Sequence, residues 1–120
     1  MRPGAKFKLT EAEWGAVIAE MRTLLIEQAK TRQTISYSAL ADRLETVSVH
    51  PYSYAFARLL TQIGGEEEQA GRPLLPALVV RKATGIPGAG YFKGTGVRGH
   101  TATEEEWADE LQRVYDYWSQ

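Results

Sequence analysis

Hydrophobic residues recur every three or four positions in two long stretches of the chain, which is the spacing of an amphipathic helix. In the first stretch, from Thr10 to about Lys30, these residues are Trp14, Val17, Ile18, Met21, Leu24 and Leu25. In the second, from Thr103 to Trp118, they are Trp107, Leu111, Val114, Tyr115 and Trp118. Each stretch opens with a threonine followed three positions later by a glutamate, the capping-box pattern of a helix start. The sequence therefore predicts a first and a last helix over these ranges.

Two shorter helices are expected between them. Ser36 can cap a helix that runs to about Leu44, after an extended pair at 34–35. A third helix is predicted to begin near Pro51, because proline suits a first helical turn, and to stop at the glycine pair 64–65. Its inward positions are Phe56, Leu59, Leu60 and Ile63. Two helices in succession, the second longer, are typical of a helix-turn-helix.

The chain between the third and the last helix predicts a hairpin. Residues 66–72 are polar and indicate a loop or one more helical turn, in which three consecutive acids form a solvated surface. The apolar run from Leu74 to Lys82 favours a strand, and Pro76 favours an edge position or a bulge. Residues 83–88 are rich in turn formers, and 89–93 resume an extended pattern.

The predicted fold class is therefore α+β. Its order is that of a winged helix-turn-helix domain: three helices, a two-stranded hairpin wing and an additional C-terminal helix. We expect one such domain over residues 1–120, with a flexible segment at 1–8.

Composition removes several kinds of chemistry. The chain has no cysteine, so disulfides, thiolate metal sites and a cysteine nucleophile are excluded. The longest apolar run, residues 74–80, is only about as long as a strand, and no signal peptide follows the N-terminal basic residues. We therefore expect a cytoplasmic protein without a membrane span.

Charge is segregated along the chain although the net charge is only −1. Residues 71–100 hold five basic and no acidic side chains, whereas residues 101–120 hold six acidic side chains and one basic. The basic window favours a polyanionic partner. The isoelectric point of about 6.1 favours a partner other than nucleic acid.

Three short segments carry a resemblance to a known family. Residues 36–41 read Ser-Tyr-Ser-Ala-Leu-Ala, residues 76–80 read Pro-Ala-Leu-Val-Val, and Gly90 precedes Tyr91. With these segments the stretch 35–91 distantly resembles the DNA-binding half of the O6-alkylguanine alkyltransferases and the alkyltransferase-like proteins. Those families show Thr-Tyr-x-x-Leu-Ala, Pro-Cys-His-Arg-Val-Val and Gly-Gly-Tyr.

The resemblance implies a winged-helix architecture that binds DNA, and it makes Tyr37 a candidate contact to the DNA backbone. A half-buried core tyrosine is the alternative for Tyr37. This chain lacks the nucleophilic cysteine and the His-Arg pair, and Tyr54 stands about where the intercalating arginine of those families falls. The resemblance therefore implies no alkyl transfer.

Two groups of residues are candidates for nucleic-acid binding. A helix turns by about 100° per residue, which places Tyr54, Arg58 and Thr61 opposite the apolar face of the third helix. Arginine, tyrosine and threonine commonly contact bases and phosphates. The second group consists of the basic residues that flank the hairpin, namely Arg81, Lys82, Lys93 and Arg98. The alternative for the first group is an ordinary solvated helix face. The alternative for the second group is a hairpin whose basic side chains only keep it soluble.

No candidate for catalysis emerges. The two histidines, His50 and His100, have no partner at the spacing of metal ligands. The glycines at 85, 88 and 90 lie between two expected strands, whereas a phosphate-binding loop opens a helix. We therefore expect neither an enzyme nor a metal or other cofactor.

The leading hypothesis is a small winged-helix protein that binds double-stranded DNA, as a regulator or an accessory factor in DNA processing. The alternative is a protein-interaction module on the same scaffold that does not bind nucleic acid. In that alternative the partner docks on the acidic, aromatic last helix or on the hairpin.

Overall fold

The computed structural model describes residues 9–92 and 102–120. Along the chain the elements are α1 (Glu11–Lys30), β1 (Ile35–Ser36), α2 (Tyr37–Arg43), α3 (Tyr54–Gln69), the 3-10 turn η1 (Leu75–Leu78), β2 (Val79–Val80), α4 (Ala89–Phe92) and α5 (Glu104–Trp118). The protein is thus mixed helical with a small two-stranded sheet, which agrees with the predicted α+β class. The segment 1–8, for which we expected flexibility, lies outside the described residues.

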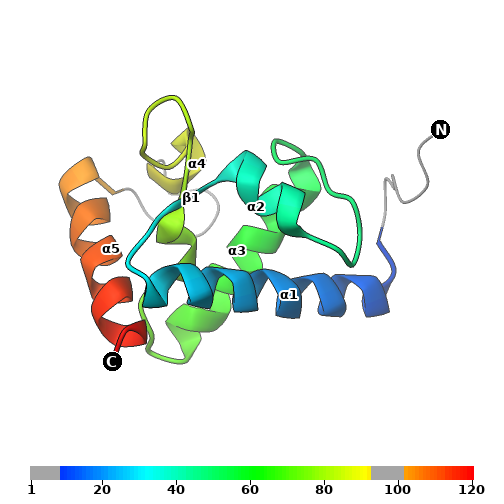
Figure 1. Cartoon of the computed structure of the whole chain (residues 1–120), viewed down its shortest axis with the longest axis horizontal. Helices are drawn as coiled ribbons and strands as arrows, with labels where there is room; N and C mark the ends of the chain where they lie inside the picture. Colours follow the sequence, from blue (N-terminus) through cyan, green and yellow to red (C-terminus); the bar gives the residue numbers. More distant parts are fainter. Residues whose placement is uncertain (1–8, 93–101) are drawn as a thin grey trace.

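The helices are arranged around the short apolar segment that holds η1 and β2. In Figure 1, α1 runs along one side of the molecule, α5 lies against its C-terminal end, and α3 crosses behind it. η1 contacts α1, α3 and α5. All residues from Leu74 to Val80 are buried. This segment is therefore the central support of the fold, and the chain leaves it at Arg81.

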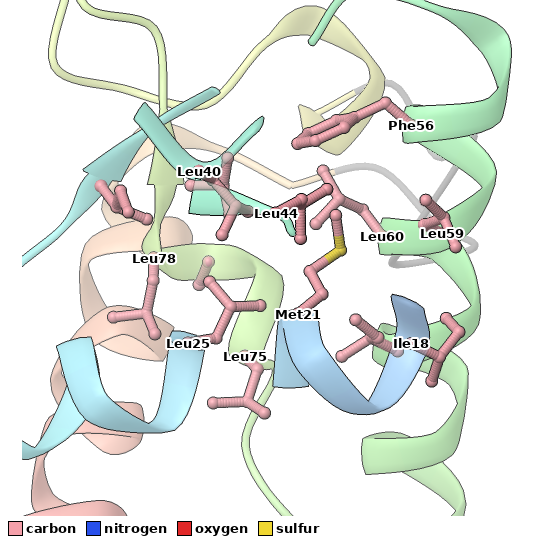
Figure 2. Close-up of a cluster of buried hydrophobic side chains, with 14 of the residues drawn as sticks. Ile18, Met21, Leu25, Leu40, Leu44, Phe56, Leu59, Leu60, Leu75 and Leu78 are labelled. Atoms are coloured by element: carbon pink, nitrogen blue, oxygen red, sulfur yellow. The ribbon is translucent and has the colours of Figure 1, made fainter. Parts of the chain in front are cut away.

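The hydrophobic core joins the same elements. Figure 2 shows leucine, isoleucine, methionine and phenylalanine side chains pointing toward one another. They are Ile18, Met21 and Leu25 of α1, Leu40 of α2, Phe56, Leu59 and Leu60 of α3, and Leu75 and Leu78 of η1, with Leu44 after α2. The four inward positions predicted for the third helix are all buried, as the sequence predicts.

Helix starts follow local capping. At Thr10 and Thr103 both hydrogen bonds of the capping box form, so the predicted starts of α1 and α5 are confirmed. The Ser36 hydroxyl accepts from the backbone N–H of Ala39 and caps α2 as predicted. The third helix begins later than expected, because the cap is Ser53 and not the region of Pro51.

The predicted stop at Gly64 and Gly65 is wrong. α3 continues to Gln69, and the glycine that follows its end is Gly71, whose φ is +74°. A helical glycine costs about 1 kcal/mol relative to alanine. Interactions of the last turns with α1 and the following loop offset this cost, and they are centred on Glu67.

The middle acid of the run 66–68 is not solvated, contrary to expectation. The side chain of Glu67 is 0% exposed and forms ion pairs with Arg22 of α1 and Arg72 after α3. Burial raises the pKa of the Glu67 carboxyl, but hydrogen bonds and charge from Arg72 and Arg22 outweigh burial and lower the pKa below its ordinary value. Glu67 therefore fastens the end of α3 to α1.

The predicted hairpin is also wrong. Residues 75–78 form a 3-10 turn, and only Val79 and Val80 of the predicted strand form a β-strand. Pro76 lies in the first turn of η1, where its missing N–H is not needed. β2 pairs in parallel with β1, with Ile35 opposite Val79. Residues 89–92 form the helical turn α4 instead of a second strand.

α5 satisfies polar groups at the start and in the middle of the central segment. The indole Nε1–H of Trp107 donates to the carbonyl of Ala77 at 2.9 Å. The Glu110 carboxylate accepts from the backbone N–H of Leu74 at 2.8 Å. Buried backbone groups need such partners. One face of the last helix thus packs against the core.

Candidate nucleic-acid interface

A cleft of about 380 Å³ opens between the start of α2, the first half of α3 and the chain that leads into α4. Its walls are mainly apolar and include several aromatic rings. The residues that line it include Tyr37, Tyr52, Phe56, Thr61, Arg81 and Tyr91. Such a concave, ring-lined surface with a few polar groups is typical of a ligand site.

Tyr37 forms one wall of this cleft. Its hydroxyl accepts from the backbone N–H of Gly88 at 2.9 Å, which ties α2 to the chain before α4. Its ring lies 5.9 Å from that of Tyr52 and 6.3 Å from that of Phe56, measured between centroids. Burial raises the pKa of the Tyr37 phenol above its ordinary value. Tyr37 is half-buried, as expected for a core tyrosine, and it also lines the cleft.

Tyr37→Phe should lower the free energy of unfolding by about 0.5 to 1.5 kcal/mol, because the Gly88 N–H loses its acceptor. Urea denaturation measures this loss, and hydrogen exchange at Gly88 should accelerate. The matched control is Tyr54→Phe, since Tyr54 is 78% exposed and should show almost no change. Equal stability changes in the two variants would contradict the role given to the Tyr37 hydroxyl.

The outer face of α3 borders the cleft. Tyr54 and Arg58 are exposed and Thr61 is half-buried, on the side opposite the buried residues of the helix. The predicted division of this helix into two faces is therefore confirmed. The Thr61 hydroxyl donates to the carbonyl of Ala57 at 2.9 Å, and both residues line the cleft.

The arginines of the described residues differ in their partners, and Arg43 donates only to the side-chain amide oxygen of Gln28, at 3.4 Å. Arg22, Arg32, Arg72 and Arg113 form ion pairs with carboxylates. Within residues 9–92 and 102–120, no carboxylate lies within salt-bridge distance of Arg58 or Arg81. Arg58 lies on the face beside the cleft and Arg81 lines the cleft. Their charges are available to a partner.

Arg81 and Lys82 follow β2 and enter a tight turn. The Arg81 N–H donates to the carbonyl of Ile86, and the Gly85 N–H donates to the carbonyl of Arg81, both at 2.8 Å. Gly85 has a φ of +73°, which favours glycine. The side chains of Arg81 and Lys82 are exposed. Lys93 and Arg98, the other basic candidates, lie outside the described residues.

The fold thus brings together Tyr37, Thr61 and Arg81 in one cleft, with Tyr54 and Arg58 on the adjoining face of α3. Lys82 is next to this group but does not line the cleft. The sequence did not indicate that Tyr52 and Phe56 line a cleft, and it indicated no binding role for Tyr91. Tyr52 is 61% exposed, and its backbone N–H donates to Nδ1 of His50 at 3.1 Å. Of these three residues, only Tyr91 had a sequence signal, because the Gly90-Tyr91 pair is part of the family resemblance.

The described residues contain no group of three or more histidine, aspartate and glutamate side chains that could hold a metal ion. In the same part of the chain, no helix is long and apolar enough to cross a membrane. Comparisons with protein-family models, curated proteins and solved structures found no match for this chain.

Proposed function

We propose that this protein binds DNA through the outer face of α3 and the cleft beside it, as a regulator or an accessory factor in DNA processing. The observation that carries the proposal is the pair of guanidinium groups, Arg58 and Arg81, which no carboxylate of the described residues neutralises. Guanidinium groups form strong, charge-assisted hydrogen bonds with phosphate oxygens. The proposal assigns no reaction to the protein.

In this proposal α2 and α3 act as the helix-turn-helix pair of a winged-helix type of domain. α3 faces the DNA, and the turn at 81–86 takes the place of the hairpin wing at the DNA backbone. The three segments that carry the resemblance to the alkyltransferase-like proteins support this assignment. Tyr37 and Tyr91, from two of them, meet at the cleft, and Arg81 directly follows the third.

The aromatic cleft favours DNA that presents an unpaired base. Base faces stack on aromatic rings whatever the sequence, and a base must leave the duplex stack to reach such rings. Tyr37 and Tyr52 offer such rings in the cleft, and Arg81 lies at the same site to contact a flanking phosphate. We therefore expect tighter binding to a duplex with a bulged or mismatched base than to a fully paired duplex.

Titration of labelled DNA at 50 and 200 mM salt tests the proposal. If the protein neutralises about four phosphates, affinity should fall roughly 100- to 200-fold over this fourfold rise in salt. Replacing Arg81 and Lys82 together by alanine should weaken binding to all sequences and reduce the salt slope by about one or two units.

The control for that double variant is Lys30→Ala, an exposed cation in the last turn of α1. It should bind as the parent protein does. Absence of binding to paired, bulged and single-stranded DNA at 50 mM salt would overturn the proposal, as would an affinity that does not change with salt.

A protein-interaction module is the second candidate. The observation that favours it is Tyr117 on α5, which is 43% exposed and lies against Trp118 with ring centroids 5.0 Å apart. Exposed aromatic residues are enriched at interface hot spots. This function would be favoured if the parent protein does not bind DNA in the titration above and instead binds a protein partner that the Tyr117→Ala variant no longer binds.

A further inference from the structure

Trp14 links the start of α1 to the outer face of α3. Its indole Nε1–H donates to Oε1 of Gln62 at 2.6 Å, across 48 positions of the chain. The ring also packs partly buried against the hydrophobic core. The hydrogen bond and the packing against the core therefore fix the orientation of the indole at the surface of α3.

Arg58 lies over this fixed ring. Its guanidinium carbon is 5.7 Å from the centroid of the Trp14 ring and 5.9 Å from that of Tyr54, one helical turn earlier. A ring attracts a guanidinium group through the face of the ring and leaves N–H donors on the edges of the cation free. The two rings therefore hold the Arg58 guanidinium in place, while it keeps its charge and has N–H groups available to a partner.

The three acids of α3, Glu66 to Glu68, lie in its last turns, and two of them form ion pairs within the protein. Glu66 and Glu67 lie toward the other end of the helix, where Arg22 pairs with both carboxylates. Gln62 donates to Glu66 as well, at 3.1 Å. The negative charge nearest to Trp14 on α3 is thus neutralised within the protein.

We propose that Trp14 is a positioning residue that presents the Arg58 guanidinium to a phosphate of the DNA backbone. This inference rests on the proposed DNA binding and extends the binding surface to the first turns of α1. A long arginine side chain loses conformational freedom when it binds, and a side chain already held by two rings loses less. The edges of a guanidinium fit two phosphate oxygens at once.

Trp14→Leu should weaken DNA binding by about three- to tenfold, because the ring contact to Arg58 is lost. Trp14→Phe keeps a ring and should restore most of the affinity. In an Arg58→Ala background, Trp14→Leu should have no further effect, since residues that act through one another are not additive. Binding is measured under conditions in which circular dichroism shows every variant to be folded.

The control is Trp118→Leu, a half-buried tryptophan at the end of α5, which should lower stability without changing DNA affinity. Parental affinity in Trp14→Leu would overturn the inference, as would additive losses with Arg58→Ala. An equal loss of affinity in Trp118→Leu would also overturn it, because a general structural effect would then explain both.

A second measurement separates this inference from the proposed function. In the parent protein, the Arg58 Nε–H should give an NMR signal shifted by the Trp14 ring, and inorganic phosphate should perturb this signal. Trp14→Leu should abolish the ring shift and weaken the phosphate response. If the parent protein does not bind DNA, the proposed function fails. If the Arg58 signal is unchanged in Trp14→Leu, the positioning role of Trp14 fails, whatever the result with DNA.

Discussion

Phe56→Ala should lower the free energy of unfolding by about 3 to 5 kcal/mol. The ring is 1% exposed, lies among the core residues of Figure 2 and meets the Tyr37 ring edge to face. Its removal leaves a cavity that the helices around it cannot close. Small domains are stable by only about 5 to 15 kcal/mol, so a large part of the population should unfold on mild warming.

The matched variant is Arg58→Ala, two positions further along α3 and on its outer face. It loses two ring contacts and should cost only about 0.5 to 1 kcal/mol in stability. If it contacts a DNA phosphate as proposed, it should weaken binding to all sequences and reduce the salt slope by about one unit. Urea denaturation compares the two variants directly. Equal losses of stability would mean that the assignment of faces on α3 is wrong.

Glu67→Gln should lower the free energy of unfolding by about 2 to 3 kcal/mol near neutral pH. The buried carboxylate accepts from Nε of Arg72 at 3.0 Å and from Nη2 of Arg72 at 2.8 Å, and it also pairs with Arg22. Both arginines reach solvent and can be hydrated after the change, so the loss should stay below that of a fully buried ion pair. The control is Glu68→Gln, an exposed neighbour that should change stability little.

The same variant has a defined pH dependence. Because the pKa of Glu67 is lower in the folded protein than its ordinary value, its contribution is fully present above that ordinary value. The contribution is lost as pH falls through the folded pKa. The stability difference between the parent and Glu67→Gln should therefore be constant from pH 7 to about pH 5 and shrink below pH 4. A difference that grows with acid would contradict the ion-pair account.

The sequence by itself determined the elements that depend on neighbours along the chain. The 3.6-residue period and the threonine and serine caps located α1, α2 and α5, because both signals act within one or two helical turns. The same period assigned the two faces of α3. Thr10, Ser36 and Thr103 cap their helices as predicted.

Tertiary structure decided where each segment finds its partner. Val79 and Val80 pair with β1, more than 40 positions earlier, and no local pattern distinguishes this parallel pairing from a hairpin. An apolar run without periodicity fits a strand and a buried 3-10 turn equally well, and Pro76 together with contacts from three helices decided between them.

The candidate site divides in the same way. Residue type and helix period pointed to Tyr54, Arg58 and Thr61, whereas only the fold brings Tyr37 and Arg81 into one cleft with Tyr52. The sequence also gave no sign that the middle acid of the run 66–68 is buried between two arginines. The free energy of a charge depends on the partner and the solvent around it, and chain segments that are distant in sequence supply both.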